Sequence, residues 1–338
     1  MHIQLATLLV VSTLVACPSA PASLAPDAGP APVGEGEGDG EGEGEGEGEG
    51  EGEGEGEGEG EGEGEGEGAW RHRVSACLAT YATCPRAMVM AHGGDWVVPD
   101  RPFDSAAAYQ QGVQDGADGI ETDIRITLDG RAVIAHSSPI ELYESLDCAG
   151  DRIEQMTAAE VTQCHLAPST TETFQLVSDV LDRADGRALI ELEVKETADL
   201  QIVIDLVIEK GAQDKSFFLL GVDEVALLPT LNGGDQVWAL ARIGDPAQVP
   251  AMLAAPRVIM LELDRSYGSA TEADISALIS GSIHPAGKRA LTSSDLHFAT
   301  LDNQREVFAQ GFDVLLSYGV PDGVQAAREV NEQHGLPP

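Results

Sequence analysis

Eight short apolar runs recur between residues 87 and 318, and amphipathic stretches separate many of them. Alternating strand and helix signals are typical of an α/β fold built on a parallel sheet. Eight repeats within about 270 residues predict a closed (β/α)8 TIM barrel, and an open doubly wound sheet is the alternative. The runs are residues 87–92, 119–124, 188–194, 216–221, 236–242, 257–263, 289–293 and 313–318.

Five of the intervening stretches are predicted to be helices, and four of them repeat apolar residues at spacings of three and four, which is the periodicity of a helix. Asp104-Ser105 is a capping signal at the start of the first stretch. The predicted helices are residues 104–114, 173–184, 198–210, 271–279 and 303–310.

One further apolar run, residues 132–136, does not fit the repeat. Only residues 128–131 separate it from the second strand, and a parallel crossover needs a dozen residues or more. Asp129-Gly130 is a strong signal for a tight hairpin turn. We therefore predict a β-hairpin insertion after the second strand. If Asp129 and Gly130 are the two turn residues, Asp123 lies opposite His136.

The N-terminus predicts export. Residues 3–16 form an apolar run that is too short to span a bilayer and is typical of a signal-peptide core. The run ends in Leu14-Val15-Ala16-Cys17, which resembles a bacterial lipobox and implies cleavage before Cys17 and lipid attachment to its thiol. We predict a lipoprotein signal peptide at residues 1–16 and a membrane-anchored protein at the periplasmic face or cell surface. A plain secretory signal with an incidental cysteine is the alternative.

Residues 34–68 alternate glycine strictly with glutamate, or with aspartate at Asp39. Glycine disfavours regular structure, and the dense negative charge repels itself. We therefore predict that residues 17–68, which begin with a Pro/Ala-rich stretch, form a disordered tether before one folded domain at residues 69–338. Cation binding by the acidic repeat is the alternative.

The formal net charge of the chain is −39, and 17 of its acids lie in this repeat. Without them, 41 acids and 19 bases remain, a net charge of −22. An acidic domain lacks the basic footprint of a nucleic-acid-binding protein, so nucleic acid is excluded as a partner.

The folded part contains four cysteines, and an even number in an exported protein predicts disulfides. Three connectivities are possible, and we favour the short-loop pairs Cys77–Cys84 and Cys148–Cys164. A zinc site is the competing interpretation, although no pair has CxxC spacing.

Acidic residues gather in the second predicted strand. Glu121, Asp123 and Arg125 alternate with apolar or neutral residues and therefore share one face. Active sites of TIM barrels lie at the C-terminal ends of the strands, and two carboxylates at this spacing can bind a hard divalent cation. A surface ion-pair network is the alternative.

The third predicted strand repeats the pattern with Glu191, Glu193 and Lys195. Glu193 would complete a metal site of three carboxylates, and Lys195 would face the same way and hold a phosphate oxygen. A solvated strand end is the other interpretation of Lys195. We expect Glu191 to be a barrel-interior residue paired with a neighbour.

Two histidines accompany these acids. His92 ends the first predicted strand and precedes Gly93-Gly94, which allows close backbone approach to a ligand. His136 ends the hairpin. Either histidine alone is more often structural, but two imidazoles beside three carboxylates form a plausible set for metal-assisted phosphoryl transfer.

Residues 116–138, GADGIETDIRITLDGRAVIAHSS, closely resemble the signature of the glycerophosphodiester phosphodiesterase family. Ala91-His92-Gly93 is similar to the family's His-Arg-Gly, Glu193-Val194-Lys195 to its Glu-x-Lys, and residues 311–316 to its closing strand. The resemblance implies a TIM barrel of the PLC-like phosphodiesterase type that hydrolyses glycerophosphodiesters to glycerol 3-phosphate and an alcohol.

The resemblance also implies residue roles. It places Ca²⁺ or Mg²⁺ on Glu121, Asp123 and Glu193, acid/base or nucleophilic chemistry on His92 and His136, and the phosphate on Lys195. The string Ile-Glu-Thr-Asp is also similar to sphingomyelinase D-like phospholipases. Cleavage of lipid headgroups, or binding without catalysis by a surface lipoprotein, are therefore the alternative functions.

The family's arginine after the first histidine is Gly93 here, which removes a phosphate ligand. Arg125, on the face of Glu121 and Asp123, is our candidate replacement. An ion pair of Arg125 with Asp95 or Asp129 is the alternative.

Overall fold

The computed structural model describes residues 81–96, 100–184, 187–265, 270–294 and 299–336. All of them belong to one compact unit, Gly62–Pro338. The predicted signal peptide, Cys17, the tether and Cys77 lie outside the described residues. The limits 1–16, 17–68 and 69–338 therefore stay predictions. Among the residues that are described, no helix combines the length and the apolar character that a bilayer crossing requires.

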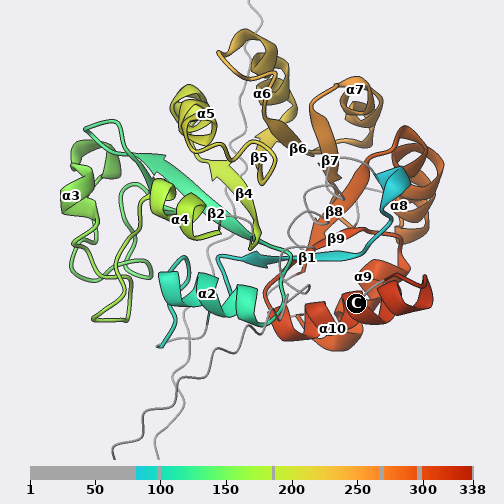
Figure 1. Ribbon diagram of the computed structural model, residues 1–338, viewed down its shortest axis with the longest axis horizontal. Helices are drawn as coiled ribbons and strands as arrows, with labels where there is room; N and C mark the ends of the chain where they lie inside the picture. The colour runs from blue at the N-terminus through green and yellow to red at the C-terminus, as the bar shows by residue number, and fades with distance from the viewer. Residues whose placement is uncertain (1–80, 97–99, 185–186, 266–269, 295–298, 337–338) are drawn as a thin grey trace, which may run out of the picture. The chain divides into compact units, whose positions relative to one another are not determined.

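Eight parallel strands form a closed barrel (Figure 1). Their order around the barrel is β1-β9-β8-β7-β6-β5-β4-β2, and pairing of β1 with β2 closes it. All eight predicted strands are confirmed, and closure excludes the open sheet. The strands are β1 (Met88–His92), β2 (Gly119–Ile126), β4 (Leu189–Val194), β5 (Ser216–Gly221), β6 (Trp238–Arg242), β7 (Val258–Glu262), β8 (Arg289–Ser293) and β9 (Val314–Ser317).

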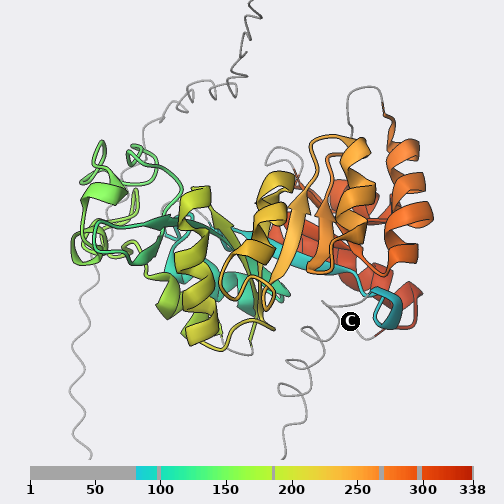
Figure 2. The same ribbon diagram turned by 90° about the horizontal axis from the view of Figure 1, so that it is seen from above.

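Helices cover the outside of the barrel (Figures 1 and 2). Five match predicted helices: α2 (Ala106–Gln114), α4 (Val177–Ala184), α5 (Leu200–Glu209), α8 (Glu272–Leu278) and α9 (Leu301–Ala309). Four were not predicted: α3 (Ala158–Val161), α6 (Val222–Leu227), α7 (Val249–Ala254) and α10 (Val320–Gln333). Short 3-10 segments are Tyr81–Thr83, Ile153–Gln155, Thr197–Asp199, Leu228–Thr230, Pro246–Gln248 and His284–Ala286, and Ile279–Ile283 is a π-helical turn.

The barrel interior changes from apolar to charged along the strands. Its lower part is a cluster of large apolar side chains that includes Met90, Leu240 and Met260. Two residues further along each of these three strands stand His92, Arg242 and Glu262. Because every second residue points inward, the apolar packing ends where a charged layer begins, at the C-terminal ends of the strands.

The predicted hairpin is confirmed, but its register differs by one residue. β3 (Ala132–Ile134) pairs antiparallel with β2, with Ile124 opposite Ile134. Thr127 N–H donates to the Arg131 carbonyl at 3.0 Å, which leaves three residues in the turn instead of two. The last of them, Gly130, has φ 74°, as the left-handed position of such a turn requires.

The extra turn residue moves every partner by one place. Asp123 therefore lies beside Ala135, whose N–H donates to the Asp123 carbonyl at 2.9 Å. The prediction that His136 stands opposite Asp123 is wrong, and another part of the structure must orient His136.

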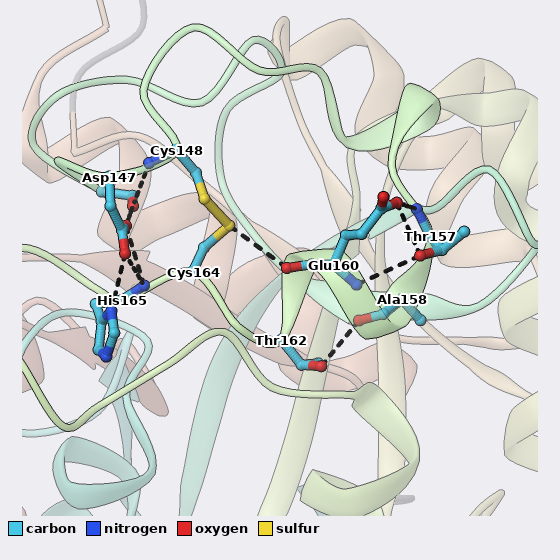
Figure 3. The surroundings of a disulfide bond; sticks show 9 residues. Asp147, Cys148, Thr157, Ala158, Glu160, Thr162, Cys164 and His165 are labelled. Carbon is cyan, nitrogen blue, oxygen red and sulfur yellow. Dashed lines mark hydrogen bonds and ion pairs between the residues drawn. A yellow bond between two sulfur atoms is a disulfide. The ribbon is translucent and has the colours of Figure 1, made fainter.

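Residues 137–173, between β3 and α4, form an insertion that stands out from the barrel on the side of β2 (green in Figure 2). Apolar residues of the insertion pack against β3. The predicted disulfide Cys148–Cys164 is confirmed and joins residues 16 positions apart (Figure 3). The predicted pair Cys77–Cys84 involves a residue outside the described part and stays a prediction. The apolar cluster that β3, the insertion and Phe174 form together consists of Val133, Ala135, Ile140, Ile153, Val161, Cys164, Leu166 and Phe174.

Replacing both cysteines of this bond, Cys148→Ser with Cys164→Ser, should lower the free energy of unfolding by about 3 kcal/mol, because a bridge across a loop of this size restricts the unfolded chain. Denaturant titration of the oxidised wild type and the double variant measures the difference. An unchanged midpoint would contradict a stabilising role for the bond.

Candidate active site

Three carboxylates from neighbouring strands meet at the C-terminal end of the barrel. Asp123 of β2 lies in register with Glu193 of β4, and Glu121 stands two residues earlier on β2. One carboxylate oxygen from each of Glu121, Asp123 and Glu193 lies within 4.8 Å of the other two. The predicted cluster is confirmed as a geometric group.

This carboxylate cluster fits a divalent cation. Glu121 Oε2 accepts a hydrogen bond from Gly93 N–H at 3.1 Å, but Oε1 is buried and has no hydrogen-bond partner among the described residues. Burial and the nearby Asp123 and Asp104 raise the pKa of Glu121 well above its ordinary value. A buried anionic oxygen without a donor is costly, and a bound cation removes that cost. Carboxylate oxygens are the ligands that Ca²⁺ and Mg²⁺ prefer.

Two cations border the cluster. Lys195 Nζ lies 2.5 Å from Asp123 Oδ1 and 3.1 Å from Glu193 Oε1. Arg242, the last residue of β6, places Nη1 3.4 Å from Glu193 Oε1 and Nε 2.7 Å from Glu262 Oε2. Although burial opposes the effect, Lys195 and Arg242 together lower the pKa of Glu193. The Arg242 side chain is 51 % exposed, so its guanidinium stands at the mouth of the barrel.

Arg242 was not among the predicted site residues. Its position as the last residue of a predicted strand was the available signal, because that is where TIM-barrel sites draw their residues. No motif marked it, since its partners Glu193 and Glu262 come from other strands.

His92, at the end of β1, places Nε2 3.8 Å from Glu121 Oε2. The ring of Tyr318 lies 4.2 Å from the His92 ring and that of Phe103 lies 5.3 Å away, measured between centroids. Burial lowers the pKa of His92 to about 4. The imidazole is therefore neutral at pH 7 and able to accept a proton.

His136 follows β3 and is held by the insertion. Its Nδ1 lies 2.7 Å from Tyr143 Oη and 3.2 Å from Ser137 Oγ. The buried carboxylate of Glu144 accepts the N–H groups of His136 at 2.8 Å and of Ser137 at 3.0 Å. After burial, which is the largest cause, the His136 imidazole also contributes to the lowered pKa of His92, so the two rings lie within electrostatic range of each other. Tyr143 and Glu144, which orient His136, were not predicted.

Arg125 has partners outside the carboxylate cluster. Its Nε donates to the His136 carbonyl at 3.0 Å, and Nη1 lies 3.5 Å from Glu196 Oε1. Asp95 instead pairs with Arg101. Arg125 thus forms an ion pair with Glu196, and not with Asp95 as the alternative had it. A role of Arg125 in phosphate binding stays a prediction.

The space beside Gly93 is filled by Phe103. A side chain at position 93 would overlap the Phe103 ring, and the backbone φ of 62° also disfavours any residue except glycine. An arginine at this position therefore has no room, and the phosphate charge must be met by other residues.

Glu191 lies in the barrel interior, but it lacks the hydrogen-bonded partner that was predicted for it. It is fully buried beside Glu121, and neither of its carboxyl oxygens has a hydrogen-bond partner among the described residues. Burial, with Glu262 and Glu193 nearby, raises the pKa of Glu191 well above its ordinary value. The expected pairing with a neighbour is wrong, and a protonated, neutral carboxyl is the form that such a position favours.

Residues 100–212, which carry the carboxylate cluster and His136, match the model of the glycerophosphoryl diester phosphodiesterase family. The uncharacterized protein YqiK of Bacillus subtilis is 32% identical over 102 residues, 28% of this chain and 41% of that protein. A glycerophosphodiester phosphodiesterase of Caldanaerobacter subterraneus subsp. tengcongensis is 26% identical over 141 residues, 39% of this chain and 55% of that protein. The chain thus spans about half the length of the curated relatives it matches.

Solved structures share the barrel. A glycerophosphoryl diester phosphodiesterase from Parabacteroides distasonis has a TM-score of 0.64 at 15% identity, covering 77% of this chain and 92% of its own. A phosphodiesterase from Oleispira antarctica, solved with the product sn-glycerol-3-phosphate, has a TM-score of 0.57 at 18% identity, covering 73% and 99%. These likenesses show the common TIM-barrel fold.

Proposed function

We propose that this chain is a metal-dependent hydrolase of glycerophosphodiesters that releases glycerol 3-phosphate and an alcohol, because residues 100–212 match the model of the glycerophosphoryl diester phosphodiesterase family. The observation that carries the proposal is the cluster of Glu121, Asp123 and Glu193 with His92 beside it. The phosphodiesterase names of the relatives and the product complex of the Oleispira protein support it.

Overall, the oxygen of water becomes bonded to phosphorus, the bond between phosphorus and the alcohol oxygen breaks, and the leaving alcohol gains a proton. Glu121, Asp123 and Glu193 would hold a Ca²⁺ or Mg²⁺ ion. Such an ion supplies positive charge to the phosphate oxygens.

The two imidazoles carry the proton transfers in this proposal. His92 is neutral at pH 7 and suited to accept a proton from the attacking water. Tyr143 is partly buried, which raises its pKa to about 12, so its hydroxyl stays protonated and can donate to His136 Nδ1. The proton of His136 then resides on Nε2, where it can be given to the leaving alcohol.

Lys195 and Arg242 are the cations that we place on the phosphate. Both form ion pairs with Glu193 Oε1. Arg242→Ala should lower kcat/KM by about tenfold or more, the scale of a lost charge-assisted hydrogen bond, and Arg242→Lys should recover part of the loss. Metal affinity should not fall, because the change removes a cation that competes for Glu193.

Arg125→Ala is the comparison for Arg242→Ala. Arg125 is also an arginine at a strand end, but it pairs with Glu196. A loss in Arg125→Ala as large as that in Arg242→Ala, with metal affinity unchanged, would support the phosphate role predicted for Arg125 and contradict the role proposed for Arg242.

We also infer that the chain is exported and anchored through lipid on Cys17. The lipobox-like sequence supports this, and so does the Cys148–Cys164 bond, since disulfides persist in oxidising compartments. Radiolabelled palmitate should enter the protein expressed in a bacterial host, and Cys17→Ser should not be labelled. Equal labelling of both would contradict the anchor.

Product analysis tests the proposed reaction. The full chain with Mg²⁺ or Ca²⁺ should convert glycerophosphocholine to glycerol 3-phosphate and choline, as separated by chromatography. Release of phosphocholine and glycerol would assign a different bond. Cleavage of sphingomyelin, but not of glycerophosphocholine, would indicate a phospholipase D-like enzyme instead.

A further inference from the structure

Large apolar side chains are exposed together on the insertion. Three of the six large apolar residues that are exposed in the described part of the chain fall within five positions. They are Leu142, Tyr143 and Leu146, with exposures of 68%, 55% and 65%, and we call them the apolar tip. Exposed apolar groups that gather in one place mark sites of interaction.

The apolar tip is held by buried neighbours. Ile140 is 2% exposed, and its N–H donates to the Asp151 carbonyl at 2.8 Å. Ser145 is fully buried, and its N–H donates to the Glu141 carbonyl at 3.1 Å, which closes one helical turn. Leu142 and Tyr143 lie within this turn, and Leu146 directly follows it. Their exposure is thus built into a segment with a defined backbone.

The apolar tip is continuous with the candidate active site. Tyr143 Oη contacts His136 Nδ1 at 2.7 Å. Tyr143 and Phe103 also line one small cavity of about 20 Å³, and the Phe103 ring packs against His92. Tyr143 therefore joins the apolar tip to His136, and the cavity that it shares with Phe103 lies next to His92.

The charge of the insertion indicates what can cover the apolar tip. Residues 137–173 contain seven acids and one arginine, which disfavours contact with an anionic bilayer. A hydrocarbon chain carries no charge, and one that is attached to a phosphodiester at His136 would begin beside Tyr143.

We propose that the apolar tip binds the hydrocarbon chain of the substrate. The preferred substrate is then a glycerophosphodiester that carries one acyl chain, which is a lysophospholipid. This inference rests on the proposed function and narrows its substrate class.

Substrates with and without an acyl chain test the inference directly. With the full chain and added Mg²⁺ or Ca²⁺, kcat/KM for lysophosphatidylcholines below their critical micelle concentrations should exceed that for glycerophosphocholine. It should rise by up to roughly fourfold for each methylene that becomes buried. If glycerophosphocholine is cleaved and the acyl chain brings no gain, this inference fails alone. If neither compound is cleaved, the proposed function fails.

Variants of Leu142 and Leu146 test whether the acyl chain of the substrate binds at the apolar tip. Leu142→Ser with Leu146→Ser should lower kcat/KM for lysophosphatidylcholine by about tenfold or more and leave that for glycerophosphocholine unchanged, since only the former has a chain to bury. Leu227→Ser, at an exposed leucine of α6, is the matched control and should change neither. Equal values for the double variant and wild type on both substrates would overturn the inference. So would wild-type binding to phosphatidylglycerol vesicles that the double variant loses, because it would assign the apolar tip to a membrane surface.

Discussion

Asp123→Asn should lower metal affinity and kcat together, each by at least about a hundredfold, because it removes one anionic ligand from a site of three. Asn keeps the shape of the side chain, so the loss reports on charge. Glu121→Gln should behave in the same way, since Glu121 Oε1 is buried without a protein donor. Calorimetric titration with Ca²⁺ and Mg²⁺, beside initial rates at limiting metal, measures both effects.

Glu191→Gln is the matched control for these variants. Glu191 is buried beside Glu121 in the same barrel interior, but it lies outside the carboxylate cluster. If Glu191 is neutral, as its environment favours, the amide should leave metal affinity nearly unchanged. Wild-type affinity and activity in Asp123→Asn would show that the cation binds elsewhere.

His92→Ala and His136→Ala should each reduce kcat by about a hundredfold or more, the scale of general acid–base catalysis, with metal affinity within a few fold of wild type. This separation of turnover from metal binding distinguishes the histidines from the carboxylates. His165→Ala is the control, because His165 pairs with Asp147 on the insertion and was not assigned to the site. Unfolding of both site variants, detected by circular dichroism, would instead indicate structural histidines.

The barrel and its carboxylates were predictable because both follow from local periodicity. Alternation along one strand places Glu121 and Asp123 on a common face. The parallel neighbour β4 then brings Glu193 into register with Asp123. Neither step needs knowledge of loops.

The features that were missed depend on loops or on distant strands. The hairpin register shifted because Gly130 closes a three-residue turn, a choice that Asp-Gly alone does not determine. Tyr143 and Glu144 reach His136 from an insertion without a repeating pattern. Phe103 fills the space beside Gly93 from a segment ten residues away. Contacts of this kind appear only once the chain is folded.

The α-helices that escaped prediction are mostly short. α6 and α7 have six residues each, fewer than two turns, so their apolar periodicity is too brief to recognise. α10 has fourteen residues, but Pro321 and Gly323 near its start read as helix breakers. Proline in the first turn is compatible with a helix because the N–H it lacks would have no intrahelical partner there.

Hydrolysis of glycerophosphodiesters with a cation bound by Glu121, Asp123 and Glu193 is the reaction that we propose for this chain. Phosphorus NMR of glycerophosphocholine with the full chain measures it most directly, first with excess EDTA, then with Ca²⁺ or Mg²⁺ in excess of the chelator, and finally with Asp123→Asn. We predict no reaction in EDTA, conversion of the diester signal to that of glycerol 3-phosphate when the metal is restored, and little conversion by the variant. Equal conversion in EDTA and in metal, or by Asp123→Asn and wild type, would contradict the claim.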